Sequence, residues 1–315
     1  MNYFPYQTSR VSAASPYLDE LPATAGARAL VLDGGGSTGN AWLIGVLAGL
    51  AVEGVDVTAP QLTVGTSAGA TAAAQLVGAS AKELYEQILT TPVAPAPSGR
   101  NTGKTVDARV TDQLSRIKAI SAASHGPQMM HQKMGKAALE LPGARDTEFS
   151  ARWKSVVRSR LTSTNWPQRL LYLTAVQAQT GALVVFENSG GLPLVDAVAA
   201  SCSSGLPFWI GDRAYIDGGY RRNENADLAE GYAKVLVLSP LGGKSLHPAD
   251  WGMELSAQIE QLSRSGSQVQ VVVPTAAAEH YMGTNAMNQS LRAPAAIQGF
   301  LQGRERAGEL REFWN

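Results

Sequence analysis

The sequence predicts a protein of the α/β class with a mainly parallel central sheet. Short apolar runs of buried-strand type alternate with longer apolar or amphipathic stretches, and the first of them are joined by short connections. Strand–helix–strand–helix order of this kind implies parallel strands linked by right-handed crossovers. The chain has 315 residues, 44% of them hydrophobic and 17% charged, which is an ordinary globular composition.

The N-terminal part of the chain supplies the first strands and helices of this pattern. Residues 1–26 are rich in Pro, Ser, Ala and Thr without periodicity, and we interpret them as a leader. Strands are expected over 28–33 and 61–65, and helices over 40–53, 68–77 and 81–90, the last of them capped by Ser80.

A basic, helical insert is expected over about 92–168, opening with a Pro/Gly/Ser loop. Residues 100–169 carry 13 Lys/Arg and 5 Asp/Glu, so 13 − 5 gives +8, and the rest of the neutral chain compensates with −8. Such a charge excess is typical of a solvated helical face. The alternative is a surface that makes peripheral contact with anionic lipid head groups.

Sheet structure returns after the insert, and the whole of 27–312 is expected to form a single domain. A turn at residues 179–181 indicates a hairpin. Strands are expected over 169–176, 182–187, 208–211, 213–217, 233–239 and 269–273, and helices over 194–201, 251–263 and within 286–312.

Composition narrows the class of function. A net charge of zero gives no indication of a nucleic-acid partner. The single Cys and four scattered His residues match no metal motif, so neither a metal nor another cofactor is expected. The N-terminus does not resemble a signal peptide, and the apolar run 41–52 is too short to span a bilayer. We therefore expect a cytoplasmic protein. The basic insert would favour the alternative, in which the protein associates peripherally with membranes.

Residues Gly65–Gly69 form a G-x-S-x-G motif between a strand and a helix. This context is the one that a nucleophile elbow requires, because the tight turn projects its serine from the top of the sheet. Gly65 and Gly69 suit the close approach of the two backbones, where a Cβ would clash. Ser67 is therefore the candidate nucleophile.

A second glycine-rich segment, Asp33–Asn40, follows the first strand. Successive glycines can turn several N–H groups toward an anion, and the following helix adds its positive end. Acyl transfer needs such donors for the oxyanion. The same segment matches a dinucleotide-binding fingerprint, although no acidic residue ends the next strand. It also nearly matches a phosphate-binding loop, although Asn40 replaces the lysine of that motif. A purely structural turn is the remaining alternative.

Asp217 ends a strand and is followed by Gly218 and Gly219. An Asp-Gly pair alone usually marks only a turn. A serine nucleophile needs a base, however, and a partly desolvated carboxylate beside an oxyanion hole can serve as one. His280 follows Asp217 in the chain and offers the alternative of a Ser-Asp-His triad, as in an α/β-hydrolase or acyltransferase.

Taken together, these segments resemble the patatin-like phospholipase family. The matching pieces are Asp33–Gly39, Gly65–Gly69, Asp217–Gly219, and Ala199-Ala-Ser with the later Leu206-Pro-Phe. The resemblance implies a three-layer α/β/α patatin-like fold and a Ser-Asp dyad that cleaves acyl esters of lipids.

Carried onto this sequence, the resemblance makes Ser67 the nucleophile and Asp217 its base. It assigns the oxyanion to the N–H groups of Gly35 and Gly36, with help from Gly34, and makes Gly39 a turn glycine. Two features depart from the family pattern. Thr38 stands where a basic residue is usual, and residues 220–225 are unusually polar. Because of these departures, the remaining alternative is a non-catalytic module that binds a lipid or a partner.

Overall fold

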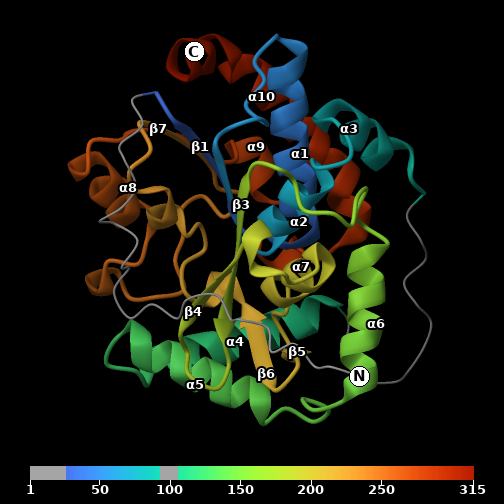
Figure 1. Ribbon diagram of the computed structural model, residues 1–315, viewed down its shortest axis with the longest axis vertical. Coiled ribbons are helices and arrows are strands. Elements are labelled where there is room, and N and C mark those ends of the chain that lie inside the picture. The colour runs from blue at the N-terminus through green and yellow to red at the C-terminus, as the bar shows by residue number, and fades with distance from the viewer. Residues whose placement is uncertain (1–25, 93–105) are drawn as a thin grey trace.

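The computed structural model describes residues 26–92 and 106–315, and it shows a central sheet between two sets of helices (Figure 1). The sheet has eight strands in the order β5-β6-β3-β2-β1-β7-β8, with β4 paired to β3. The strands are β1 (Arg28–Leu32), β2 (Leu62–Gly65), β3 (Leu170–Gln177), β4 (Leu183–Phe186), β5 (Phe208–Ile210), β6 (Arg213–Asp217), β7 (Lys234–Leu238) and β8 (Gln268–Val272). The three-layer α/β/α prediction is confirmed.

The sheet divides into a parallel part and an antiparallel part. Strands β3, β2, β1, β7 and β8 are parallel, as helical crossovers between apolar strands predict. Strands β4 and β6 run antiparallel to β3, and β5 runs antiparallel to β6. The β3–β4 hairpin closes where Gly181 adopts a φ of 71°, which glycine adopts without strain.

One face of the sheet is covered by α1 (Gly36–Val52), α2 (Ala68–Gln75), α3 (Ala81–Thr90), α7 (Leu194–Ser201) and α10 (Arg292–Trp314). Helices α1 and α10 pack closely along their length (Figure 1). Glycines make this approach possible, because a Cβ on Gly45 would lie 2.1 Å from the carbonyl oxygen of Ala296. A Cβ on Gly299 would likewise lie 2.3 Å from that of Trp42. This packing fixes the start of α10 near the start of α1.

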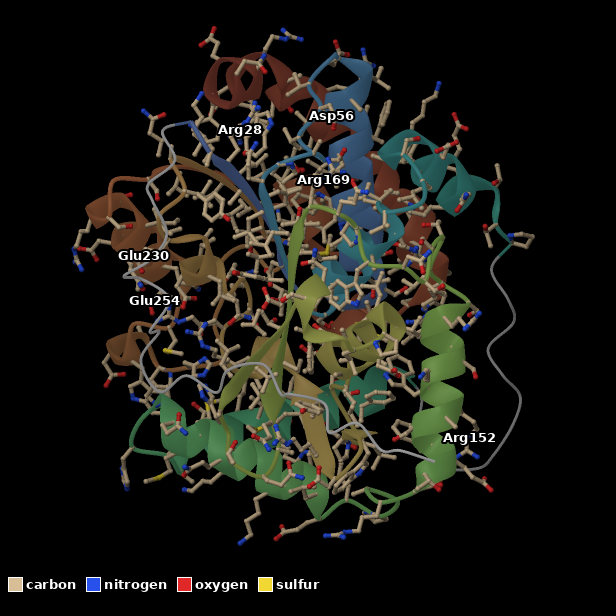
Figure 2. All side chains as sticks on the ribbon, viewed as in Figure 1. Arg28, Asp56, Arg152, Arg169, Glu230 and Glu254 are labelled. Carbon is tan, nitrogen blue, oxygen red and sulfur yellow. The ribbon has the colours of Figure 1, made fainter. Side chains whose placement is uncertain are left out.

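The opposite face is covered by α8 (Leu255–Arg264) over the parallel strands and by α4 (Val106–Ala122) and α5 (Pro127–Leu139) over the antiparallel ones. Met130 and Met134 of α5 are buried there against β3 and β6, as core residues. Helix α6 (Thr147–Arg158) completes the helical segment expected between the two halves of the sheet. Figure 2 shows Arg152 on the outer side of α6, where it pairs with Asp146 and Glu148.

Element types agree closely with the sequence-based expectation, and two helix starts differ. Helix α1 begins at Gly36 rather than residue 40, so the second half of the glycine-rich segment forms its first turn. Helix α8 begins at Leu255 rather than residue 251, because Gly252 takes a left-handed conformation with φ 61° and interrupts the chain there. The predicted leader falls, except for Gly26, outside the described residues. No helix in the described ranges is both long and apolar enough to cross a membrane.

Candidate active site

Ser67 lies in a sharp turn between β2 and α2. Its backbone has φ 52° and ψ −109°, a conformation that is costly for any residue with a Cβ. The flanking glycines permit the turn. A Cβ on Gly69 would lie 1.9 Å from the carbonyl oxygen of Leu32, and a Cβ on Gly65 would lie 2.8 Å from the Cα of Ala70. This turn conformation places the serine side chain at the carboxyl edge of the parallel strands.

Asp217 ends β6 and faces the serine directly. The Ser67 hydroxyl donates a hydrogen bond of 2.7 Å to Oδ2 of Asp217, and the N–H of Gly219 donates one of 2.9 Å to Oδ1. The two residues are 150 positions apart in the chain. They meet because β2 and β6 pair with opposite edges of β3 and end at neighbouring positions along it, Gly65 opposite Leu173 and Asp217 opposite Ala175. Gly218 packs against β3, where a Cβ would collide with Thr174.

Burial controls the charge of this carboxyl. Asp217 is 6% exposed, and its desolvation raises its pKa to about 6, although the hydrogen bonds from Ser67 and Gly219 oppose the shift. At neutral pH the group is therefore mainly ionised but holds a proton far more readily than a free carboxylate. A pKa close to the working pH is what a general base requires.

The glycine-rich segment lies next to the serine. A Cβ built on Gly34 would lie 3.7 Å from the Cβ of Ser67. Gly35 and Gly36 have φ of 145° and 66°, which orient their amides in a way that other residues rarely allow. The N–H of Gly34 approaches the carbonyl of Asn223 at 3.5 Å. The N–H groups of Gly35 and Gly36 have no partner among the described residues.

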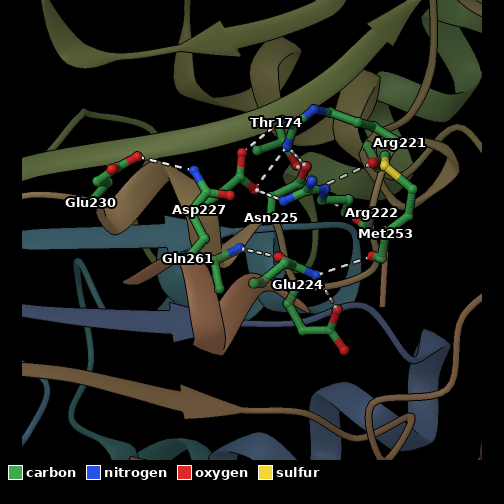
Figure 3. Close-up of polar contacts among 12 residues, drawn as sticks. Thr174, Arg221, Arg222, Glu224, Asn225, Asp227, Glu230, Met253 and Gln261 are labelled. Carbon is green, nitrogen blue, oxygen red and sulfur yellow. Dashed lines mark hydrogen bonds and ion pairs between the residues drawn. The ribbon is translucent and has the colours of Figure 1, made fainter. Parts of the chain in front are cut away.

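Two side chains that support the elbow were not singled out from the sequence. The hydroxyl of Ser201 accepts a 2.9 Å hydrogen bond from the N–H of Ser67 and so fixes the turn. Asn225 is fully buried, and its amide donates to the hydroxyls of Thr66 and Thr174 and to the carbonyl of Gly218 (Figure 3). It thereby ties the serine turn to the aspartate turn. The sequence signal for Ser201 was its place in the Ala199-Ala-Ser piece, and the signal for Asn225 was the polarity of segment 220–225.

That polar segment is buried and internally paired rather than solvated. Arg221 and Arg222 form ion pairs with Asp227 at 2.6 and 3.3 Å (Figure 3). Glu224 is 1% exposed and accepts hydrogen bonds from Ser239 and Gln258. Burial raises the pKa of Glu224. The unusual polarity therefore builds a connected scaffold behind the aspartate turn.

Thr38, which stands where the family pattern has a basic residue, also holds two segments of the chain together. It is fully buried, and its hydroxyl donates a 2.7 Å hydrogen bond to the carbonyl of Tyr281. Its N–H donates to the carbonyl of Ala286 at 3.0 Å. The substitution fastens the loop after α9 (Ala276–Glu279) to the start of α1.

Three further side chains with polar or nucleophilic groups form no hydrogen bond with the Ser67 hydroxyl or the Asp217 carboxylate in the described part of the chain. His280 is exposed at the end of α9, its ring lies tilted against that of Tyr281, and it forms no hydrogen bond with Ser67 or Asp217 within the described structure. Cys202 contacts the carbonyl of Ser67 at 3.1 Å, and burial raises the pKa of its thiol to about 12. Such a thiol is not a ready nucleophile. Ser203 bonds the carbonyl of Ala199 at 2.7 Å.

The serine and the aspartate open into a cavity of about 1400 Å³. Its walls combine the glycine segment, the start of α2, α3, α4 and the loop before α10. This volume exceeds the roughly 300–1,000 Å³ typical of small-molecule sites. It is roomy enough for an acyl chain together with the alcohol to which the chain is attached.

The family model for patatin-like phospholipases matches residues 30–230. The chain belongs to the patatin-like phospholipase family. Its class of activity is therefore that of a lipid acyl hydrolase, acting on a lipid substrate. The matched range contains both Ser67 and Asp217.

Solved structures show a more distant similarity. The crystal structure of VipD from Legionella pneumophila shares 14% identity over 90% of this chain and 67% of its own, with a TM-score of 0.42. The type III effector protein ExoU shares 15% identity over 90% of this chain and 53% of its own, with a TM-score of 0.37. This chain thus spans little more than half of the second protein. No curated protein matches the sequence significantly.

Proposed function

We propose that this protein is a serine hydrolase of lipid acyl esters that works through a Ser67–Asp217 dyad. The observation that carries the proposal is the 2.7 Å hydrogen bond from the Ser67 hydroxyl to a buried carboxylate, with the serine in a strained turn beside two glycine amides that have no partner in the described part of the chain. A nucleophile, a base within hydrogen-bond reach and oxyanion donors are the three parts that acyl transfer requires.

The first half of the reaction acylates the serine. The Ser67 oxygen attacks the ester carbonyl while Asp217 takes the hydroxyl proton on Oδ2, and the carbonyl oxygen becomes an oxyanion facing the N–H groups of Gly35 and Gly36. Gly34, whose N–H approaches Asn223, would add a third donor only after shifting from that carbonyl. The C–O bond to the alcohol then breaks, and the alcohol leaves with the proton from Asp217.

The second half releases the acyl group. Asp217, ionised again, takes a proton from water as the water oxygen attacks the acyl carbon, and the Ser67 oxygen leaves with that proton. The products are a carboxylic acid and free enzyme. No histidine is needed, because burial gives Asp217 a pKa of about 6 and so makes it a stronger base than an exposed aspartate.

The cavity mouth suits a lipid presented at a surface. Leu89, Val273 and Met287 line the cavity and are 40, 39 and 42% exposed. Apolar side chains at the rim of an apolar cavity can enter a lipid layer, and the basic insert would add attraction to anionic head groups. We propose peripheral membrane contact through this rim, with residues 27–312 acting as one hydrolase domain.

The test is labelling and hydrolysis by wild type and Ser67→Ala. Wild type should react with a fluorophosphonate probe and cleave a short p-nitrophenyl ester and mixed phospholipid vesicles. Ser67→Ala should do neither while keeping its circular dichroism spectrum. A folded wild type that fails to label and cleaves neither substrate would refute the proposed activity.

A further inference from the structure

A guanidinium lies against the first turn of α1, close to the oxyanion glycines. Arg292, the first residue of α10, donates from Nη1 to the carbonyl and hydroxyl of Ser37 at 2.8 and 3.0 Å, and from Nη2 to Oδ1 of Asn40 at 3.1 Å. Asn40 in turn donates to Gln75 of α2 at 3.0 Å. The Arg292 side chain is thus held in one orientation on the cavity wall.

A second arginine, which is exposed, lines the same cavity from another element. Arg160 follows α6 at the end of the basic insert, its carbonyl accepts a 3.0 Å hydrogen bond from Gln75, and its guanidinium lies 5.4 Å from the centre of the Trp153 ring. It also lines the cavity. Gln75 therefore connects the two arginines, through its side chain, from two elements far apart in sequence.

The two charges act on each other and on the active site. The pKa of Arg292 is lowered to about 10, first by burial and then by the positive charge of Arg160. The charge of Arg160 also acts on Cys202, whose thiol contacts the carbonyl of Ser67. Both arginines therefore line the same cavity within electrostatic range of each other, Arg292 partly buried and Arg160 exposed.

No carboxylate neutralises this pair. Within residues 26–92 and 106–315, neither the exposed Arg160 nor the partly buried Arg292 forms an ion pair, whereas the partly buried Arg221 and Arg222 share Asp227. The acidic residues that line the cavity are Asp217, engaged by Ser67, and the exposed Glu279. A partly buried guanidinium such as that of Arg292 is unfavourable without a counter-ion, and an anionic ligand in the cavity would supply one.

We propose that Arg160 and Arg292 form a phosphate-binding subsite that receives the headgroup phosphate of the lipid substrate. The assignment rests on the proposed function, since it places the scissile ester at Ser67. Asn40 lies one helical turn, about 6 Å, beyond the oxyanion glycine Gly36 along α1. That separation suits the glycerol unit between an acyl carbonyl and a phosphate.

The chemistry of the two side chains favours phosphate. Guanidinium presents a fork of N–H donors that matches two phosphate oxygens, and Nε of Arg292 has no partner among the described residues. A neutral lipid such as an acylglycerol would leave both charges uncompensated. The subsite therefore selects phosphate-bearing acyl esters over neutral ones. Through Arg160, it also places one cation of the basic insert at the cavity.

Binding to the catalytically silent Ser67→Ala protein tests the subsite without hydrolysis. The probes are two short ether lipids with no ester to cleave, hexylglycerol phosphate and hexylglycerol, followed by titration calorimetry below their micelle concentrations. The phosphate compound should bind at least about tenfold more tightly, as expected for charge-assisted hydrogen bonds. Adding Arg160→Gln should remove about tenfold of affinity for the phosphate compound and change hexylglycerol affinity by no more than about twofold.

The matched control is Arg158→Gln, an exposed arginine of α6 that does not line the cavity, which should change neither affinity. Arg292→Lys, which keeps the charge but loses the fork, should weaken phosphate binding while the protein stays folded. Equal binding of the two ethers, or an equal loss of both in Arg160→Gln, would overturn the subsite. Inorganic phosphate binding as tightly as hexylglycerol phosphate would overturn its assignment to a lipid headgroup. Absence of wild-type hydrolysis, by contrast, would refute only the proposed reaction.

Discussion

Replacing Asp217 with Asn should abolish activity and stabilise the fold at the same time. The two side chains have the same shape, and Asn can keep both contacts: its oxygen accepts from the N–H of Gly219, and its amide donates to the Ser67 hydroxyl, where Asp217 accepts in the wild type. What disappears is the ability to take a proton and the negative charge buried at a site that is 6% exposed.

The size of each effect follows from the environment of the carboxyl. Loss of a general base typically lowers kcat by about 10²–10⁴-fold. Burial raises the pKa of Asp217 from 3.8 to about 6, a difference of 2.2, and at 1.36 kcal/mol for each pKa unit this is about 3 kcal/mol. The folded state binds the proton more tightly than the unfolded state. The wild-type free energy of unfolding therefore falls as pH rises from about 4 to about 6 and then levels off.

Urea denaturation and initial rates check both parts. Above about pH 6 Asp217→Asn should be more stable than wild type by up to about 3 kcal/mol, and the gain should fade toward pH 4. Wild-type kcat/KM for a p-nitrophenyl ester should rise through a midpoint near pH 6, and Asp217→Asn should show no such rise. A variant that keeps more than a tenth of wild-type activity, or that is less stable than wild type at pH 8, would refute the assignment of Asp217 as a buried base.

Three further predictions follow from backbone geometry and from the position of His280. Ser67→Gly should be more stable than Ser67→Ala by up to about 1 kcal/mol in urea denaturation, because glycine removes the strain at φ 52° at some cost in entropy; equal stabilities would contradict a strained elbow. Gly69→Ala should lose at least about 3 kcal/mol by clashing with Leu32, whereas Gly308→Ala, a helical glycine with open space around it, should be neutral or gain up to about 1 kcal/mol by the same measurement. His280→Ala should keep kcat/KM within about twofold; a loss of about a hundredfold with an intact fold would favour a triad.

Much of the fold was predictable because local patterns and tertiary packing agree. Helix α3 spans Ala81–Thr90 as expected, since Ser80 and Glu83 form a capping box that sets its start. The strands of the parallel half were predictable from apolar runs. The starts of α1 and α8 were not, because they depend on glycine conformations that composition does not specify.

The contact between Ser67 and Asp217, the proposed dyad, was predictable from motif and strand context, and its surroundings were not. Asn225, Arg160 and Arg292 carry no motif of their own, and each acquires its place from a partner far along the chain. The Arg292 guanidinium contacts a residue 255 positions away, which no local pattern encodes.

The sequence by itself determined the elements, the elbow that presents Ser67 and the identity of Asp217, because turns and buried strands follow from residue types over short spans. Only the tertiary structure decided the 2.7 Å contact between them, the desolvation that raises the pKa of Asp217, and the placement of Arg160 and Arg292 on the wall of one cavity. Those properties depend on which distant surfaces exclude water from one another, and that exclusion is settled only when the layers pack.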